Sequence, residues 1–214
     1  MTSNGAWFAL LADGTHYAYD DGRVKSYEQK LADPDIQDAF ERHYPAGAPI
    51  EPVVDETDDE GRIRLDPIFR NTYGRTANQV QLTRITFAGK RLMVNVKVKD
   101  AFLRVSDKLD ALAKSDPAVK PFLENIGGTF NWRNVAGTNR PSAHSFGVSI
   151  DLNAKLADFW RWKKGPKVWK NRVPASIVEA FESEGFIWGG RWYHFDTMHF
   201  EYRPELTDPA CYPD

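Results

Sequence analysis

The sequence predicts an α+β fold in which a small antiparallel sheet is flanked by helices. Apolar and polar residues alternate over residues 80–87 and again over residues 92–98, with a turn sequence at residues 88–90 between them. This pattern predicts a hairpin, with a bulge or bend where the alternation of the first strand changes parity. Residues 102–112 then carry apolar side chains at helical spacing. Because strands and helices do not alternate as βαβ units, an antiparallel sheet is favoured over a parallel one.

The elements outside this hairpin and helix follow in chain order. The first 60 residues give one clear signal, a short helix that begins at Asp33-Pro34-Asp35, and the acidic stretch 55–61 predicts an exposed loop. After the long helix we expect strands over residues 129–135, 148–152 and 198–202. Pro174 begins a second helix, which ends near Gly185.

Composition limits the class of protein. The 214 residues are 42% hydrophobic and 27% charged, which is typical of a globular chain. Cys211 is the single cysteine, so an intramolecular disulfide and a cysteine-based zinc finger are both excluded. No apolar run reaches the roughly 20 residues that a membrane span needs. The apolar residues 7–12 lack a preceding basic stretch, so we expect no secretory signal in this chain.

Charge divides the chain into two parts. Residues 1–60 hold 14 Asp and Glu against 4 Lys and Arg, whereas residues 61–214 hold 16 against 24. We therefore expect an acidic, partly helical N-terminal extension over residues 1–60 and a basic domain over residues 61–214. A basic domain attracts nucleic acid, anionic lipid or an anionic cell wall, although ordinary solvated charge gives the same balance.

Two short segments, residues 142–151 and 188–201, hold three of the five histidines. The apolar residues of strand 148–152 face one side, so Asp151 faces the other, and a loop at Gly147 lets His144 fold back toward it. His199, on the last strand, supplies a third ligand. Two nitrogens and one carboxylate with an open fourth position are typical of a catalytic zinc site, at which water becomes acidic.

Four other polar residues are candidates for supporting roles. Asp196 lies three residues before His199, so the backbone between them must bend if both serve one site, and Asp196 then suits a general base. Arg133 is the candidate cation for an oxyanion, and Ser142 and Glu201 are candidates for orienting the ligands. Taken singly, each residue also has an ordinary interpretation, such as a loop histidine, a strand-end or turn aspartate, or an ion-paired arginine.

The two segments resemble a known family. Ser142-x-His144-x-x-Gly147-x-x-x-Asp151 and Asp196-x-x-His199-Phe200-Glu201 resemble the zinc D-Ala-D-Ala carboxypeptidases and L-alanyl-D-glutamate endopeptidases, which cleave peptidoglycan stem peptides. The resemblance covers roughly residues 60–203. It implies that His144, Asp151 and His199 bind zinc, that Asp196 is the base, and that Arg133 holds the substrate carbonyl or oxyanion. Arg140 is a second choice for that arginine.

The expected function is therefore zinc-dependent hydrolysis of peptide bonds in stem peptides, by a carboxypeptidase or an endopeptidase. The alternatives are a catalytically silent zinc or wall-binding module on the same fold and a nucleic-acid-binding domain; no nucleic-acid motif supports the latter. The basic, aromatic residues 158–170 are interpreted as a flap over the cleft or as packing against the sheet. Because peptidoglycan lies outside the cytoplasmic membrane, we expect the protein to be exported to the periplasm or cell wall.

Overall fold

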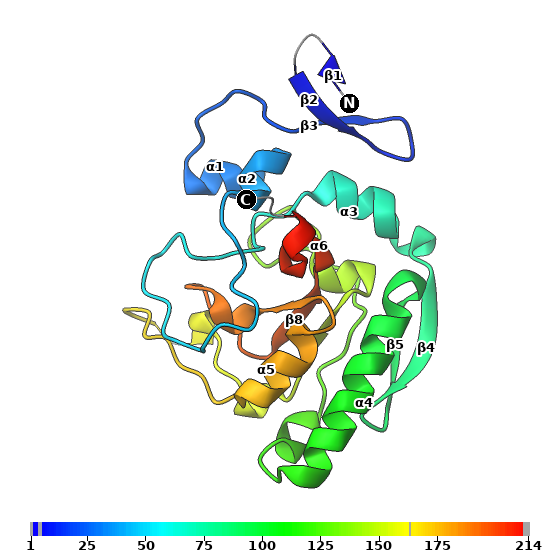
Figure 1. Cartoon of the computed structure of the whole chain (residues 1–214), viewed down its shortest axis with the longest axis vertical. Coiled ribbons are helices and arrows are strands. Elements are labelled where there is room, and N and C mark those ends of the chain that lie inside the picture. The colour runs from blue at the N-terminus through cyan, green and yellow to red at the C-terminus, as the bar shows by residue number, and fades with distance from the viewer. Residues whose placement is uncertain (1, 4–5, 163, 212–214) are drawn as a thin grey trace.

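The computed structural model describes residues 2–3, 6–162 and 164–211, and it confirms a mixed α+β fold with small antiparallel sheets flanked by helices (Figure 1). The strands are β1 (Thr2–Ser3), β2 (Ala6–Leu10), β3 (His16–Ala18), β4 (Leu82–Phe87), β5 (Lys90–Asn95), β6 (Ser149–Asp151), β7 (Phe186–Trp188) and β8 (His199–Tyr202). The α-helices are α1 (Tyr27–Ala32), α2 (Ile36–Phe40), α3 (Asp66–Tyr73), α4 (Lys99–Ser115), α5 (Ala175–Glu182) and α6 (Pro204–Thr207).

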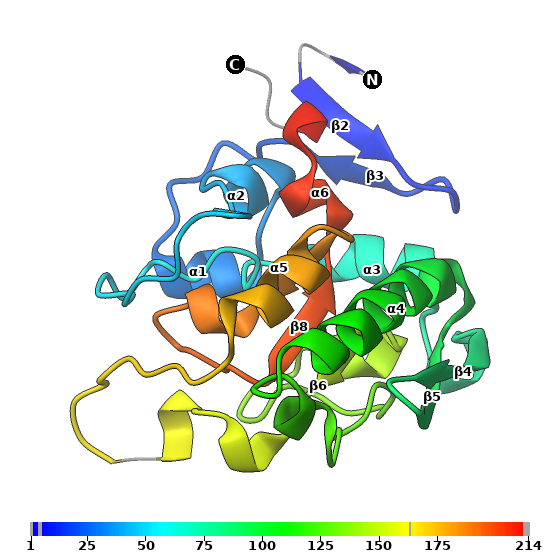
Figure 2. The ribbon, with the colours of Figure 1, turned by 60° about the horizontal axis from the view of Figure 1, so that its bottom comes forward.

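The N-terminal part is more ordered than its sequence indicates. Strands β1, β2 and β3 form an antiparallel sheet at one end of the molecule, and α1 and α2 follow it (Figures 1 and 2). Both helices begin with a capping box, made by Ser26 with Gln29 in α1 and by Asp35 with Asp38 in α2. Reciprocal side-chain and backbone hydrogen bonds satisfy N–H groups at each helix start, which allows such short helices to form.

The predicted hairpin is confirmed, with two differences in detail. Strands β4 and β5 pair in continuous register from Leu82 with Asn95 to Phe87 with Lys90, so the expected bulge is absent from this ladder. The second strand ends at Asn95 because the Asn95 side chain accepts a hydrogen bond from the N–H of Lys97 and begins a 3₁₀ turn, Val96–Val98. Helix α4 then packs against β4 and α5, as its apolar spacing predicts.

The central sheet has the strand order β6-β8-β7, and all neighbours are antiparallel. Strand β7 was not predicted, because the run Phe186–Trp188 is buried throughout and shows no alternation. The strand expected over residues 129–135 is wrong. Within this region only Asn134 forms an isolated bridge, to Pro141, and the preceding Gly128 forms another, to Asp151.

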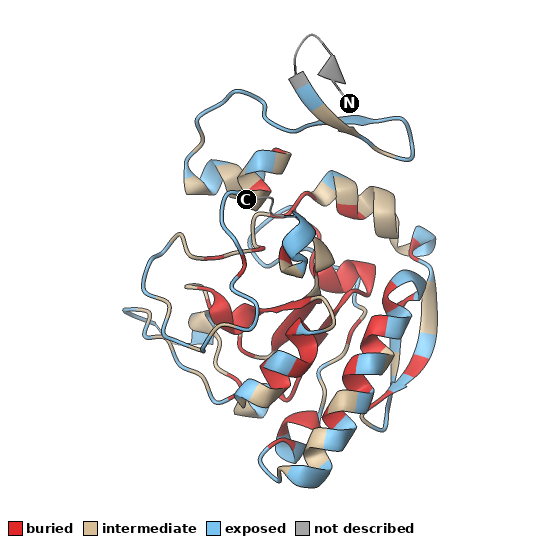
Figure 3. Cartoon of the chain, in the orientation of Figure 1, coloured by how far each residue is buried: buried red, intermediate tan, exposed pale blue. Residues whose placement is uncertain are grey.

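The main core lies where α4, α5 and the central sheet face one another. Buried residues gather on these facing sides (Figure 3). Phe181 of α5 stacks on Phe200 of β8 with ring centroids 3.9 Å apart, and both side chains are fully buried. This packing fixes β8, which carries His199 at its first residue. No helix in the described part of the chain combines the length and the apolar character needed to cross a membrane.

Tyr44 packs in a small buried cluster with Ile187 of the central sheet. The hydroxyl of Tyr44 donates to Glu182 at 2.6 Å and accepts from the N–H of Trp188 at 2.8 Å. The expectation of an exposed loop over residues 55–61 is wrong at Asp59 and Gly61, which are both buried. A carboxylate such as that of Asp59 tolerates burial when donors surround it. The boundary at residue 60 between an extension and a domain stays a prediction.

Candidate metal and catalytic site

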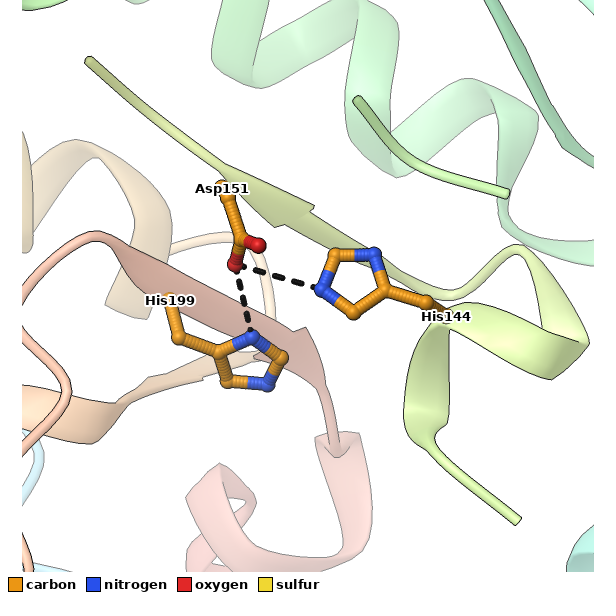
Figure 4. Close-up of side chains that lie close together, drawn as sticks. All are labelled: His144, Asp151 and His199. Atoms are coloured by element: carbon orange, nitrogen blue, oxygen red, sulfur yellow. Dashed lines mark hydrogen bonds and ion pairs between the residues drawn. The ribbon is translucent and has the colours of Figure 1, made fainter. Parts of the chain in front are cut away.

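The structure brings His144, Asp151 and His199 together at one point. His144 lies in a 3₁₀ turn, Ala143–Phe146, that precedes β6, Asp151 is the last residue of β6, and His199 is paired with it across the sheet (Figure 4). Asp151 Oδ1 lies 3.2 Å from His144 Nε2 and 3.0 Å from His199 Nδ1. The ligand atoms all lie within 4.8 Å of one another.

Gly147 allows the chain to fold His144 back toward the strand, as the sequence predicts. Its φ of 67° is in the left-handed region that favours glycine. A Cβ at this position would lie 3.0 Å from the backbone nitrogen of Asn95 and 2.9 Å from Cδ2 of Leu82. A side chain at residue 147 would therefore meet both backbone strain and a steric contact.

Hydrogen bonds to the outer ring nitrogens orient both histidines. His144 Nδ1 lies 3.1 Å from the carbonyl oxygen of Thr129, which can only accept, so this nitrogen carries a proton. His199 Nε2 donates to Glu201 Oε2 at 3.4 Å. The other ring nitrogens, Nε2 of His144 and Nδ1 of His199, face Asp151 Oδ1. Neighbouring ligands of a tetrahedral zinc with bonds of roughly 2.0–2.1 Å lie about 3.3 Å apart, so the distances here suit such an ion.

The electrostatics also favour a cation between these groups. Burial raises the pKa of Asp151, but hydrogen bonds to His144 and His199 outweigh burial and hold that pKa below its usual value. Burial lowers the pKa of His199, yet Asp151 and Glu201 together raise it to about 10. Two imidazole nitrogens that both face an ionised oxygen need a proton or a metal ion between them. This donor set therefore fits a divalent metal.

Glu201 joins the site to buried arginines. Its carboxylate is 3.3 Å from Nη1 of Arg203 and 4.0 Å from Nη1 of Arg64. Burial raises the pKa of Glu201, but His199 and the two arginines outweigh it and lower the pKa to about 2. Glu201 consequently stays ionised and holds the Nε2–H of His199. Ser142 has a different place, because its hydroxyl caps the 3₁₀ turn by accepting from the N–H of His144 at 3.4 Å.

Asp196 is placed by an irregular turn, which confirms the bend that strand parity requires. Thr197 and Met198 form a turn, and the N–H of His199 donates to the carbonyl of Asp196 at 3.1 Å. The N–H of Asp196 donates to the carbonyl of Gly189 at 2.9 Å. A Cβ at Gly189 would lie 2.6 Å from the carbonyl oxygen of Asp196, so this close approach requires glycine.

The Asp196 carboxyl lines the same cavity as the three converging residues, and its Oδ1 is buried without a hydrogen-bond partner in the described structure. Burial raises the pKa of Asp196 to about 7, while His199 lowers it and Asp151 raises it further. A buried polar atom without a partner costs free energy, so a group outside the chain is expected to satisfy it.

The two candidate arginines differ in their contacts. Arg140 is held by Asp66 at 3.0 Å and by the carbonyl oxygens of Arg62 and Arg64, each at 3.2 Å. The guanidinium of Arg133 makes no hydrogen bond or ion pair with the described residues, although its backbone is anchored by Ser145. Arg133 also lines the cavity and lies near enough to Asp196 to lower its pKa. Of these two arginines, Arg133 is the one whose guanidinium has no partner among the described residues.

The cavity has a volume of about 750 Å³ and contains residues that the sequence did not indicate. Glu28, Leu31 and Ala32 of α1 form part of its wall, and so does His194. Residues 159–162 of the basic aromatic segment also line it, which places that segment beside the cleft. Neither helix α1 nor His194 belongs to a sequence motif. The helical spacing of residues 28, 31 and 32 is the one feature of the sequence that places these cavity residues on a common face.

A second acidic group, formed by Asp20, Asp21 and Asp35, does not line this cavity and already has a cation beside it. The ammonium of Lys25 lies 2.8 Å from Asp21 and 3.1 Å from Asp35. The group is therefore explained by an internal ion pair and indicates no metal site.

A histidine–aspartate–histidine group with a buried carboxylate beside it is typical of metallopeptidase sites. Residues 136–202 match the D-alanyl-D-alanine carboxypeptidase family, which confirms the resemblance to zinc metallopeptidases of peptidoglycan. The matched span contains His144, Asp151, Asp196 and His199, and it begins after Arg133. No curated protein and no solved structure matches the chain significantly. The match supports a metallopeptidase that acts on peptidoglycan.

Proposed function

We propose that the protein is a zinc-dependent peptidase that hydrolyses a peptide bond in peptidoglycan stem peptides, as a D-Ala-D-Ala carboxypeptidase or an L-Ala-D-Glu endopeptidase. The observation that carries this proposal is the Asp196 carboxyl, which lines the cavity beside His144, Asp151 and His199 and whose buried Oδ1 has no hydrogen-bond partner among the described residues. A purely structural metal site normally has a closed shell and needs no such group. This argues against a silent binding module.

In this proposal His144, Asp151 and His199 hold the zinc through Nε2, a carboxylate oxygen and Nδ1. When bound, zinc supplies a Lewis acid that polarises the substrate carbonyl and acidifies a water molecule. Thr129 and Glu201 fix the tautomers of the two histidines, so that the correct lone pairs face the ion.

Asp196 then acts as the proton carrier. Its carboxylate accepts a proton from the attacking water as the new C–O bond forms. It then delivers that proton to the leaving amine as the peptide C–N bond breaks. The guanidinium of Arg133 donates hydrogen bonds to the carbonyl oxygen, which gains negative charge in the transition state. Because Arg133 has no competing partner in the described structure, it is free to follow that oxygen.

Digestion of purified muropeptides, followed by mass spectrometry, tests this function. We expect cleavage that a chelator abolishes and added zinc restores. Loss of a single C-terminal D-Ala identifies a carboxypeptidase. Cleavage of the bond between L-Ala and D-Glu, which separates L-Ala from the rest of the stem, identifies an endopeptidase. Cleavage that is indifferent to the chelator would contradict the metal mechanism, and salt-sensitive nucleic-acid binding without any cleavage would favour the nucleic-acid-binding alternative.

A further inference from the structure

One face of helix α1 forms a wall of the candidate active-site cavity. Glu28, Leu31 and Ala32 are spaced at i, i+3 and i+4, so their side chains share one side of the helix, and all three line the cavity that contains Asp196. This face combines one carboxylate with two apolar side chains. The wall comes from a part of the chain that lies outside the residues matched by the peptidase family.

The helix is held firmly in this position. Tyr27, which precedes Glu28, donates its hydroxyl hydrogen to Asp59, whose side chain is fully buried. Gln29 closes the capping box by accepting from the N–H of Ser26 at 2.8 Å. The hydroxyl of Ser26 also donates to Glu28 Oε2 at 3.0 Å. The Glu28 carboxylate is therefore oriented before any substrate arrives, which reduces the ordering cost of binding.

Glu28 differs from the other carboxylates of the cavity. Among the described residues four carboxylates line it, and Asp151, Glu201 and Asp196 belong to the metal and base group. Glu28 accepts only from the hydroxyl of Ser26 and meets no cation at ion-pair distance in the described structure. Outside the metal and base group, Glu28 is therefore the carboxylate of this cavity with which a positively charged substrate group can pair.

We propose that this face of α1, defined by Glu28, Leu31 and Ala32, is a subsite for an aliphatic side chain that ends in an ammonium group. The inference rests on the proposed function, since a stem peptide carries such a side chain in its diamino acid, the third residue. Leu31 and Ala32 pack against its methylene groups, and Glu28 pairs with its terminal amine. The subsite selects substrates by the free amine and leaves the bond-breaking groups unchanged.

Two synthetic stem pentapeptides test the subsite, one with a free lysine amine at residue three and one with that amine acetylated. We expect the wild-type protein to cleave the free-amine peptide with a kcat/KM about fivefold higher, as suits one partly exposed ion pair. Glu28→Gln should bring this ratio to about one. Glu51→Gln is the matched control, because Glu51 is exposed, lies in the same N-terminal part and does not line the cavity; it should keep the wild-type ratio.

Each outcome decides between the two proposals. A wild-type protein that cleaves both peptides equally, or a Glu28→Gln variant that keeps the preference, overturns the subsite and leaves the peptidase function standing. Failure of the wild-type, zinc-loaded protein to cleave either peptide overturns the proposed function, and the subsite with it. Thermal melting of both variants shows whether a lost ratio comes from binding or from unfolding, because an unfolded variant loses activity on both peptides together.

Discussion

The carboxylate of Asp59 accepts two hydrogen bonds from one residue, His194: one from its backbone N–H at 2.9 Å and one from its ring Nδ1 at 2.5 Å. The neighbouring residues add two more connections, from the N–H of Tyr193 to Asp58 O at 2.7 Å and from Trp192 Nε1 to Glu60 O at 2.6 Å. The acidic segment 58–60 therefore holds the segment that leads directly into Asp196, the proposed base.

Removal of the Asp59 carboxylate should disturb both stability and catalysis. Asp59→Ala leaves the N–H and ring of His194, the hydroxyl of Tyr27 and one nitrogen of Arg62 without their buried acceptor. We expect the free energy of unfolding to fall by about 3–5 kcal/mol in urea titrations. Tyr27→Phe removes one donor and should cost about 1 kcal/mol. A cost below 1 kcal/mol for Asp59→Ala would show that the segment is not held by this carboxylate.

The sequence alone predicts those elements whose local residue pattern is strong. The β4–β5 hairpin and helix α4 follow from alternation, a glycine turn and helical spacing. The convergence of His144 with Asp151 follows from strand parity and from Gly147, whose positive φ leaves little choice of residue. The bend before His199 likewise follows from the parity conflict with Asp196.

The elements that the sequence missed depend on contacts between distant parts of the chain. Asp59 lies in an acidic run that is typical of a solvated loop, yet it is buried where donors from distant parts of the chain meet its carboxylate, among them His194, 135 residues later, and Tyr27. Residues 129–135 were expected to form a strand, yet the carbonyl of Thr129 bonds to the ring of His144, and the backbone of Arg133 bonds to Ser142 and Ser145 in the same turn. No local pattern carries such information, since both partners are needed to define the contact.

The N-terminal part should lose stability in acid because of Asp35. Burial raises the pKa of Asp35, but the N–H groups of Asp38 and Asp21 and the ammonium of Lys25 outweigh burial and lower it below the usual value. A lowered folded-state pKa adds stability above about pH 4, the unfolded value, and this stability is lost as the pH falls through the folded-state pKa.

The comparison of wild type with Asp35→Asn measures this contribution. The difference in free energy of unfolding between the two should be largest near pH 7 and should shrink as the pH falls from about 5 to 3. Asp110→Asn, at an exposed position of α4, is the control for the loss of one surface carboxylate. A difference for Asp35→Asn that stays constant over this range would contradict the role of its ionised form.

Metal content should depend on His144. Purified protein is expected to carry close to one zinc ion per chain. His144→Ala removes one of the three proposed ligands and should lose that zinc. Metal analysis by mass spectrometry checks both values. His16→Ala is a suitable control, because His16 lies on β3 at the other end of the molecule, where it stacks on Phe8. Full zinc occupancy in His144→Ala would remove this residue from the ligand set.

Arg133 and Arg140 should give opposite results. Arg133→Ala is expected to lower turnover by roughly 10²–10³, as for the loss of an oxyanion donor, and to leave zinc content and melting temperature unchanged. Arg140→Ala is expected to lower the melting temperature instead, because its guanidinium holds Asp66 and two backbone carbonyls. If turnover is normal in Arg133→Ala and lost in folded Arg140→Ala, the assignment of the oxyanion arginine is wrong.

Asp196→Asn should separate catalysis from metal binding. The amide keeps the size of the carboxyl but cannot accept a proton, so zinc content and fold should be retained while muropeptide cleavage falls by about 10²–10⁴, the usual contribution of a general base. The structural basis is the position of Asp196 in the turn before β8, from which its carboxyl reaches the cavity, where its buried Oδ1 has no partner in the described structure.

Two other roles for Asp196 predict different measurements on the same preparation. If Asp196 were a fourth metal ligand, the asparagine variant would lose zinc along with activity, because a neutral amide is a weaker ligand than a carboxylate. If it were only a turn residue, the variant would keep both, since the backbone hydrogen bonds to Gly189 and His199 that define the turn do not involve the side chain. Near-normal cleavage by Asp196→Asn would therefore exclude the proposed proton transfer even when the variant binds zinc fully.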